Sequence, residues 1–219
     1  MTALAVNGER LWSTLMEMAD IGGTAKGGCN RQALTEKDKI GRELFIRWCK
    51  DIGCTMRVDQ MGNLFLHKAG SDDSLPPVLM GSHLDTQPTG GKFDGVYGVL
   101  GGLEVLRTLH DAGITTKHPI EVAVWTNEEG ARFSPAMVGS GVWCGEFDLE
   151  YQWSSCSINT KANIGSNNGK RIEDTQKIYI SKINKNLNDK KLNYINTKIE
   201  KIRVIKGTNF NYFSEIAIT

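Results

Sequence analysis

Residues 77–85 read PVLMGSHLD and residues 119–129 read PIEVAVWTNEE, and the segment between them, 95–110, is rich in Gly, Val and Leu. The apolar run 77–80, which stops at Gly81, and the start of the second stretch have the composition of strands, whereas 95–110 has helical periodicity. Strand, helix and strand in this order predict a right-handed crossover between parallel strands. We therefore expect an α/β fold in which 77–80 forms a buried strand.

Further elements are predicted on the amino-terminal side of this unit. Apolar residues recur at helical spacing in 7–19 and again in 35–50, which predicts two amphipathic helices. Residues 56–68 alternate well enough to predict a hairpin that turns near Gly62 and Asn63. The glycines of the segment 95–110 lack the spacing of a phosphate-binding loop, so close packing of a helix on the sheet is the better explanation for them.

The two ends of the chain differ in composition. The whole chain has 219 residues and a formal net charge of +1, which gives no general reason to expect nucleic acid or membrane partners. Residues 157–219 contain ten Lys, twelve Ile and eleven Asn, whereas residues 1–156 contain seven Lys and four Asn. We therefore predict a folded part, 1–156, and an atypical Asn/Lys/Ile-rich tail, 157–219, with weak order. A frameshift in a longer gene and a natural disordered extension both remain open as its origin.

Neither targeting nor membrane insertion is predicted from the sequence. The amino-terminal residues lack a basic segment followed by a long apolar one, and nowhere do eighteen apolar residues run together. We expect a cytoplasmic protein. The tail is basic, but its aromatic residues are few and scattered, which does not favour binding of nucleic acid.

Side chains of the kind that bind metals follow both predicted strands. His83 and Asp85 come just after the first strand, Glu128 and Glu129 come just after the second, and Asp94 lies between them. Ligand-binding groups gather at the carboxyl ends of parallel strands, so these side chains are expected to lie close together. Imidazole nitrogen and carboxylate oxygen bind zinc and manganese-type ions, and a carboxylate can bridge two ions.

These residues supply several parts of a two-metal hydrolytic site. His83 can bind one ion, Asp94 can bridge, and Glu129 can bind the second ion. Glu128 can then serve as general base, and Asp85 is placed to accept the second N–H of the imidazole. Taken singly, a His-x-Asp pair is more often structural and a Glu-Glu pair is usually solvated charge, so the specificity lies in the joint pattern.

The joint pattern resembles a known family. The stretches MGSHLDTQPTGGKFDGVYGV (80–99) and WTNEEGARFSPAMVGSG (125–141) closely resemble the M20 metallopeptidase superfamily. Within it they are most similar to the amidase branch of N-carbamoyl-L-amino-acid hydrolases, β-ureidopropionases and allantoate amidohydrolases. The similarity continues through NGERLW (7–12), GGCNRQALT (27–35) and DQMGN (59–63).

The resemblance implies an aminopeptidase-like three-layer catalytic domain, of which 1–156 forms the N-terminal part. It implies that His83, Asp94 and Glu129 are metal ligands, with Asp94 bridging, that Glu128 is the general base and that Asp85 supports the imidazole. It also implies two divalent ions per site, zinc, manganese or cobalt, and attack of water on the carbonyl of a small ureido acid. The choice between a carbamoyl amino acid and allantoate stays open.

The sequence departs from the family pattern after the matching region. The family has two further histidine ligands and an inserted lid domain that takes part in homodimer contacts, whereas the last histidine of this chain is His118. The resemblance therefore implies that the lid, the C-terminal part and the dimer contacts are missing. Two interpretations remain open: a truncated hydrolase that acts on non-peptide C–N bonds, and a non-catalytic frameshifted fragment.

Overall fold

The first two helices begin where side chains satisfy their free backbone amides. In the computed structural model, which describes residues 4–150, these helices are α1 (Gly8–Asp20) and α2 (Glu36–Asp51). Asn7 Oδ1 accepts from the first turn of α1, and Thr35 Oγ1 accepts from the first turn of α2. Such caps stabilise a helix by about 0.5–2 kcal/mol. Both predicted helices are confirmed, each displaced by one residue.

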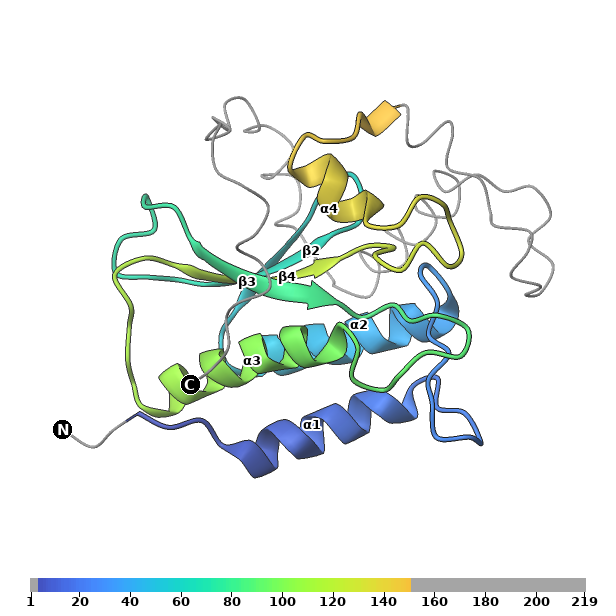
Figure 1. Cartoon of the computed structure of the whole chain (residues 1–219). Helices are drawn as coiled ribbons and strands as arrows, with labels where there is room; N and C mark the ends of the chain where they lie inside the picture. The colour runs from blue at the N-terminus through green and yellow to red at the C-terminus, as the bar shows by residue number, and fades with distance from the viewer. Residues whose placement is uncertain (1–3, 151–219) are drawn as a thin grey trace. The chain divides into compact units, whose positions relative to one another are not determined.

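Within residues 4–150 the strands form one mixed, four-stranded sheet in the order β1-β2-β4-β3 (Figure 1). Its members are β1 (Thr55–Val58), β2 (Leu64–Lys68), β3 (Val78–His83) and β4 (Ile120–Trp125). The antiparallel pair of β1 and β2 is the predicted hairpin, and β2 also pairs antiparallel with β4. Strands β3 and β4 are parallel and are joined through α3 (Val96–Asp111), so the predicted strand–helix–strand unit is confirmed.

The third strand differs from its prediction in length and in position. It continues through Gly81 to His83, and in the described part of the chain it lies at the edge of the sheet, with Val78 57% exposed. Strand β4 lies between β2 and β3, and its residues from Ile120 to Val124 are all buried. Gly81 therefore lies within β3 and does not end it. At this position β3 runs so close to the backbone of Ala123 that a Cβ would overlap it, and only glycine fits.

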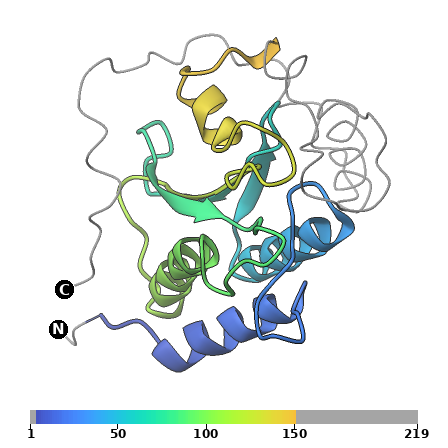
Figure 2. The same ribbon diagram turned by 45° about the vertical axis from the view of Figure 1, so that its right-hand side comes forward.

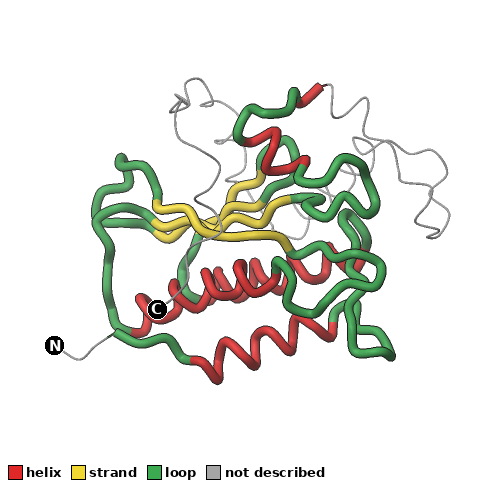
Figure 3. The backbone as a smooth tube through the Cα atoms, in the orientation of Figure 1, coloured by secondary structure: helices red, strands yellow, loops and turns green. Residues whose placement is uncertain are grey.

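Helices cover both faces of the sheet (Figures 1 and 2). Helices α2 and α3 lie against one face with α1 beneath them, and α4 (Val138–Trp143) lies over the opposite face (Figure 3). Gly102 of α3 brings the helix onto Val122 and Met80, as expected for close packing. On the opposite face, Trp143 packs against two aromatic side chains of the sheet, Phe65 and Trp125.

Two further sequence predictions concern membrane-spanning helices and the tail of the chain. Among residues 4–150, no helix combines the length and the apolar character needed to cross a bilayer. The predicted boundary at residue 156 and the tail 157–219 lie outside the described residues.

A pair of glycine substitutions tests the importance of the approach between β3 and β4. Gly81→Ala should lower the free energy of unfolding by about 1–3 kcal/mol, because its new Cβ would meet the backbone of Ala123. Gly101→Ala, in α3, is the matched control. It meets nothing within 4 Å and should raise stability by up to about 1 kcal/mol. Urea unfolding measures both, and equal stability of the two variants would contradict the close register of β3 on β4.

Candidate metal centre

His83 ends β3 and is fixed from two sides. It lies opposite Trp125 in the parallel register, and its imidazole packs against Gly95, where any side chain would overlap the ring. The Nδ1 atom lies 2.8 Å from the backbone oxygen of Asp85. Because a carbonyl can only accept, Nδ1 carries the hydrogen and donates it. In the neutral ring this leaves Nε2 with a free electron pair, which is the form that binds metals.

The two glutamates lie on the turn that follows β4. Their backbone N–H groups both donate to the carboxylate of Asp85, Glu128 to Oδ1 and Glu129 to Oδ2, each at 3.3 Å. The carbonyl oxygen of Glu128 accepts from the N–H of Met137 at 2.7 Å. The turn is therefore held at its backbone, while the two glutamate side chains are left to face the site.

Asp85 supports the imidazole in a different way from the one predicted. Its backbone oxygen accepts the imidazole N–H, whereas its carboxylate oxygen lies 3.8 Å from His83 Nδ1. The carboxylate is instead engaged by the two glutamate amides. Burial raises the pKa of Asp85 from 3.8 to about 6, and the positive charge available to His83 opposes that rise.

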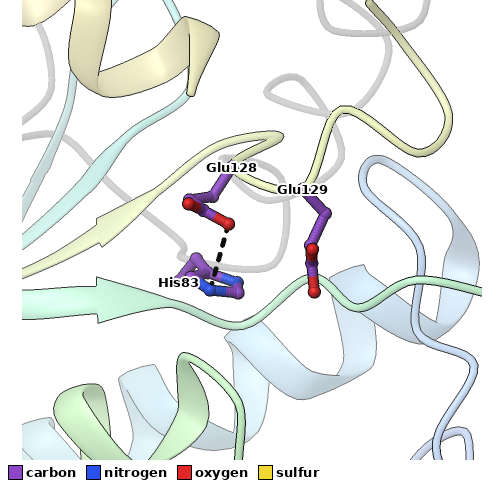
Figure 4. A group of neighbouring side chains, drawn as sticks. All are labelled: His83, Glu128 and Glu129. Carbon is purple, nitrogen blue, oxygen red and sulfur yellow. Dashed lines mark ion pairs between the residues drawn. The ribbon is translucent and has the colours of Figure 1, made fainter. Parts of the chain in front are cut away.

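Three of the predicted ligand-type residues come together. His83, Glu128 and Glu129 each offer a ligand atom, and these atoms lie within 4.8 Å of one another (Figure 4). Glu128 Oε2 lies 3.2 Å from His83 Nε2, and Figure 4 shows its carboxylate pointing at the ring. Ligands at about 2.1 Å from a tetrahedral ion stand about 3.4 Å apart, so these atoms need only small side-chain rotations to bind one ion.

The remaining predicted residue is not part of this cluster. Asp94 is exposed in the loop before α3, directly before the glycine that packs on His83. Its assignment as a bridging ligand therefore stays a prediction. Gln87, which the sequence does not single out, donates to Glu129 Oε2 at 3.0 Å.

Two buried polar residues behind the site were missed by sequence reasoning. Arg42 and Asn63 are both completely buried, and both contact Thr126, two residues before Glu128. For Arg42 a signal existed, because it lies four residues after Asp38 on the same helix face and pairs with it at 3.1 Å. For Asn63 the sequence indicated only a turn.

These observations define a class: an α/β domain with side chains that could hold a metal ion at the carboxyl ends of two adjacent parallel strands. Comparison with known proteins then gives the family. The pattern of peptidase family M20/M25/M40 matches residues 79–208, which is more than half of the chain. The chain belongs to this family, and the predicted resemblance is confirmed. The match extends into the segment 157–219, and the division at 156 remains a prediction.

Individual relatives narrow the comparison. The chain is 60% identical over 149 residues to an N-carbamoyl-L-amino-acid amidohydrolase of Rhizobium meliloti, covering 68% of this chain and 36% of the relative. It is 41% identical over 145 residues to the Geobacillus stearothermophilus protein named likewise, covering 66% of this chain and 36% of the relative. The chain thus spans about a third of the length of these relatives.

A solved structure supports the fold. A hydantoinase/carbamoylase family amidase from Burkholderia ambifaria is 50% identical, with a TM-score of 0.75, and the match covers 80% of this chain and 41% of that one. The predicted α/β class of the M20 catalytic domain is therefore confirmed, over less than half of that structure.

The pKa of Asp85 predicts a specific pH dependence of stability in the metal-free protein. The folded pKa of about 6 lies above the ordinary 3.8, so the protonated carboxyl stabilises the fold below about pH 4. That contribution is lost as the pH rises through about 6, and its full size is about 2–3 kcal/mol.

Asp85→Asn, which resembles the neutral carboxyl, lacks this loss. The free energy of unfolding of the wild type should therefore fall relative to that of the variant between about pH 4 and about pH 7. Urea unfolding in the presence of a chelator measures the difference, in which titrating groups that do not interact with Asp85 cancel. A difference that does not change with pH would show that the carboxyl is not perturbed.

Proposed function

We propose that this site is the N-terminal share of a two-metal amidohydrolase centre whose substrates are N-carbamoyl-L-amino acids. The observation that carries the proposal is the cluster of His83, Glu128 and Glu129, in a chain that is 60% identical to a relative of that name. In this proposal His83 and Glu129 are terminal ligands, Asp94 is the bridging ligand, and Glu128 is the general base. The carboxylate of Asp85 holds the turn that carries Glu128 and Glu129, called here the glutamate turn, and its backbone carbonyl orients the imidazole of His83.

The residues divide the chemistry among them. Two bound divalent ions, zinc, manganese or cobalt, would polarise the ureido carbonyl and make water a better nucleophile. Glu128, whose side chain is 30% exposed, can take a proton from the attacking water and pass it to the departing nitrogen. Asp85 and Met137 hold its backbone, and its carboxylate oxygen lies 3.2 Å from His83 Nε2. Hydrolysis with one water then gives the amino acid, ammonia and carbon dioxide.

A second candidate is a metal-binding domain without turnover of its own. Within residues 4–150 the cluster contains a single histidine, because His67, His110 and His118 lie elsewhere. One imidazole and two carboxylates bind an ion less tightly than a full set of ligands.

Three other expectations from the sequence remain predictions. They are allantoate as the alternative substrate, a cytoplasmic location and the loss of homodimer contacts.

Metal binding by the 219-residue chain separates these candidates. His83→Ala should weaken zinc binding by more than about 100-fold, because loss of even an outer-shell partner costs about 10- to 100-fold. His110→Ala, near the end of α3, is the matched control and should bind as the wild type does. Isothermal titration calorimetry gives the affinity and the stoichiometry.

Ammonia release from an N-carbamoyl-L-amino acid and from allantoate completes that experiment. Two ions per chain with turnover would support the hydrolase, and the faster substrate would identify the specificity. One weakly held ion without turnover would support the second candidate. Wild-type protein that binds none of the three metals would contradict both.

The proposed roles of the adjacent glutamates can be separated without turnover. Glu129→Gln should weaken zinc binding by more than about 100-fold, as expected for loss of a charged ligand. Glu128→Gln should change the affinity by only a few-fold, because a general base does not bind the ion. Calorimetry on both variants checks this, and the reverse order of affinities would exchange the two roles.

A further inference from the structure

Thr126, which begins the glutamate turn, is held by partners from three elements. Its N–H donates to Asn63 Oδ1 at 2.8 Å, in the turn of the β1–β2 hairpin. Its hydroxyl accepts from Arg42 Nη2 of α2 at 3.2 Å, and its carbonyl accepts from the N–H of Gly139 in α4 at 3.2 Å. Thr126 is completely buried, so water replaces none of these contacts.

Asn63 uses both ends of its amide. While Oδ1 accepts from Thr126, Nδ2 donates to the carbonyl of Gly139 at 2.9 Å and to Asp59 Oδ2 at 2.7 Å. A Cβ at position 139 would overlap Asn63 and Thr126, so the three residues are packed with no spare room. An amide is the side chain of this length that both donates and accepts, which accounts for asparagine at this position.

The path from Thr126 to the metal ligands is short and has little freedom. Asn127 adopts a left-handed backbone conformation with φ 56°, and its Nδ2 donates to the carbonyls of Phe133 and Pro135. The next two residues are the glutamates, whose amides are held by Asp85. A displacement of Thr126 therefore reaches the first glutamate across a single residue.

We infer that Asn63 is a positioning residue for the metal centre, which fixes Thr126 and so sets where Glu128 and Glu129 stand relative to His83. The inference rests on the proposed function, because it gives Asn63 a role in a site that binds metal. A purely structural role predicts something else: a less stable fold whose folded molecules bind metal as tightly as before.

The test uses Asn63→Ala in the whole chain, with Leu15→Ala of α1 as a control for lost stability, since Leu15 is a buried core residue remote from the turn. Zinc affinity, measured by calorimetry well below the unfolding temperature, should fall about 10- to 100-fold in Asn63→Ala and stay unchanged in Leu15→Ala. In the metal-free protein, hydrogen exchange at the amides of Glu128 and Glu129 should be at least about ten times faster in Asn63→Ala alone.

Two further variants identify the contact responsible. Asn63→Asp keeps the acceptor for the Thr126 amide, and in its protonated form its hydroxyl can replace one of the two N–H donors of Asn63, to the Gly139 carbonyl or to Asp59. Its zinc affinity should lie within a few-fold of wild type. Should Asn63→Ala fail to fold, Arg42→Lys keeps a cation beside Asp38 but lacks the second nitrogen that reaches Thr126, and should weaken zinc binding in the same direction.

The outcomes distinguish this inference from the proposed function. Wild-type protein that binds zinc, with Asn63→Ala unchanged in affinity and in exchange at the glutamate amides, would overturn the positioning role and leave the metal site intact. Wild-type protein that binds none of zinc, manganese and cobalt would overturn the proposed function. In that case hydrogen exchange at the amides of Glu128 and Glu129 is the measurement that tests the role of Asn63. Unchanged exchange in Asn63→Ala would overturn that role. Equal losses of affinity in Asn63→Ala and Asn63→Asp would exclude the Thr126 contact as the link.

Discussion

The parallel pairing of β3 with β4 is the constraint on which the site depends. It sets His83 opposite Trp125, so the residues that follow each strand emerge at the same edge of the sheet. A shift of one residue would turn every side chain of β3 to the other face. Gly81 allows the two backbones to approach, and Gly95, which has no side chain, leaves room for the imidazole of His83. The ligand cluster is thus a consequence of strand register before it is a consequence of side-chain chemistry.

Most of the fold could be predicted because its elements leave periodic patterns. The helices α1 and α2 and the hairpin show the spacing of half-buried elements, and the strand–helix–strand order implies parallel pairing. The edge position of β3 could not be predicted, since the apolar run 78–80 fits an edge strand covered on one face as well as a central one. Helix α4 was missed because six residues that include Gly139 and Gly141 show no helical periodicity.

The candidate site, too, could be predicted only in part. His83, Glu128 and Glu129 could be placed together because ligand-type residues directly follow strand ends, whose location the topology determines. Asn63 and Arg42 could not be found in this way, because several of their partners are backbone atoms from distant parts of the chain. Such partners have no side-chain identity, so a sequence pattern carries no record of them.

The two hydrogen-bonding ends of Asp85 separate two tasks that metal sites often assign to one carboxylate. The imidazole is oriented by a backbone carbonyl, which every amino acid would provide at this position. Aspartate itself is required by the two glutamate amides, which need a pair of acceptors side by side. Changes of side chain at position 85 therefore act on the spacing of the acidic ligands and leave the tautomer of His83 as it was, so the geometry of the centre can be tuned without altering its nitrogen ligand.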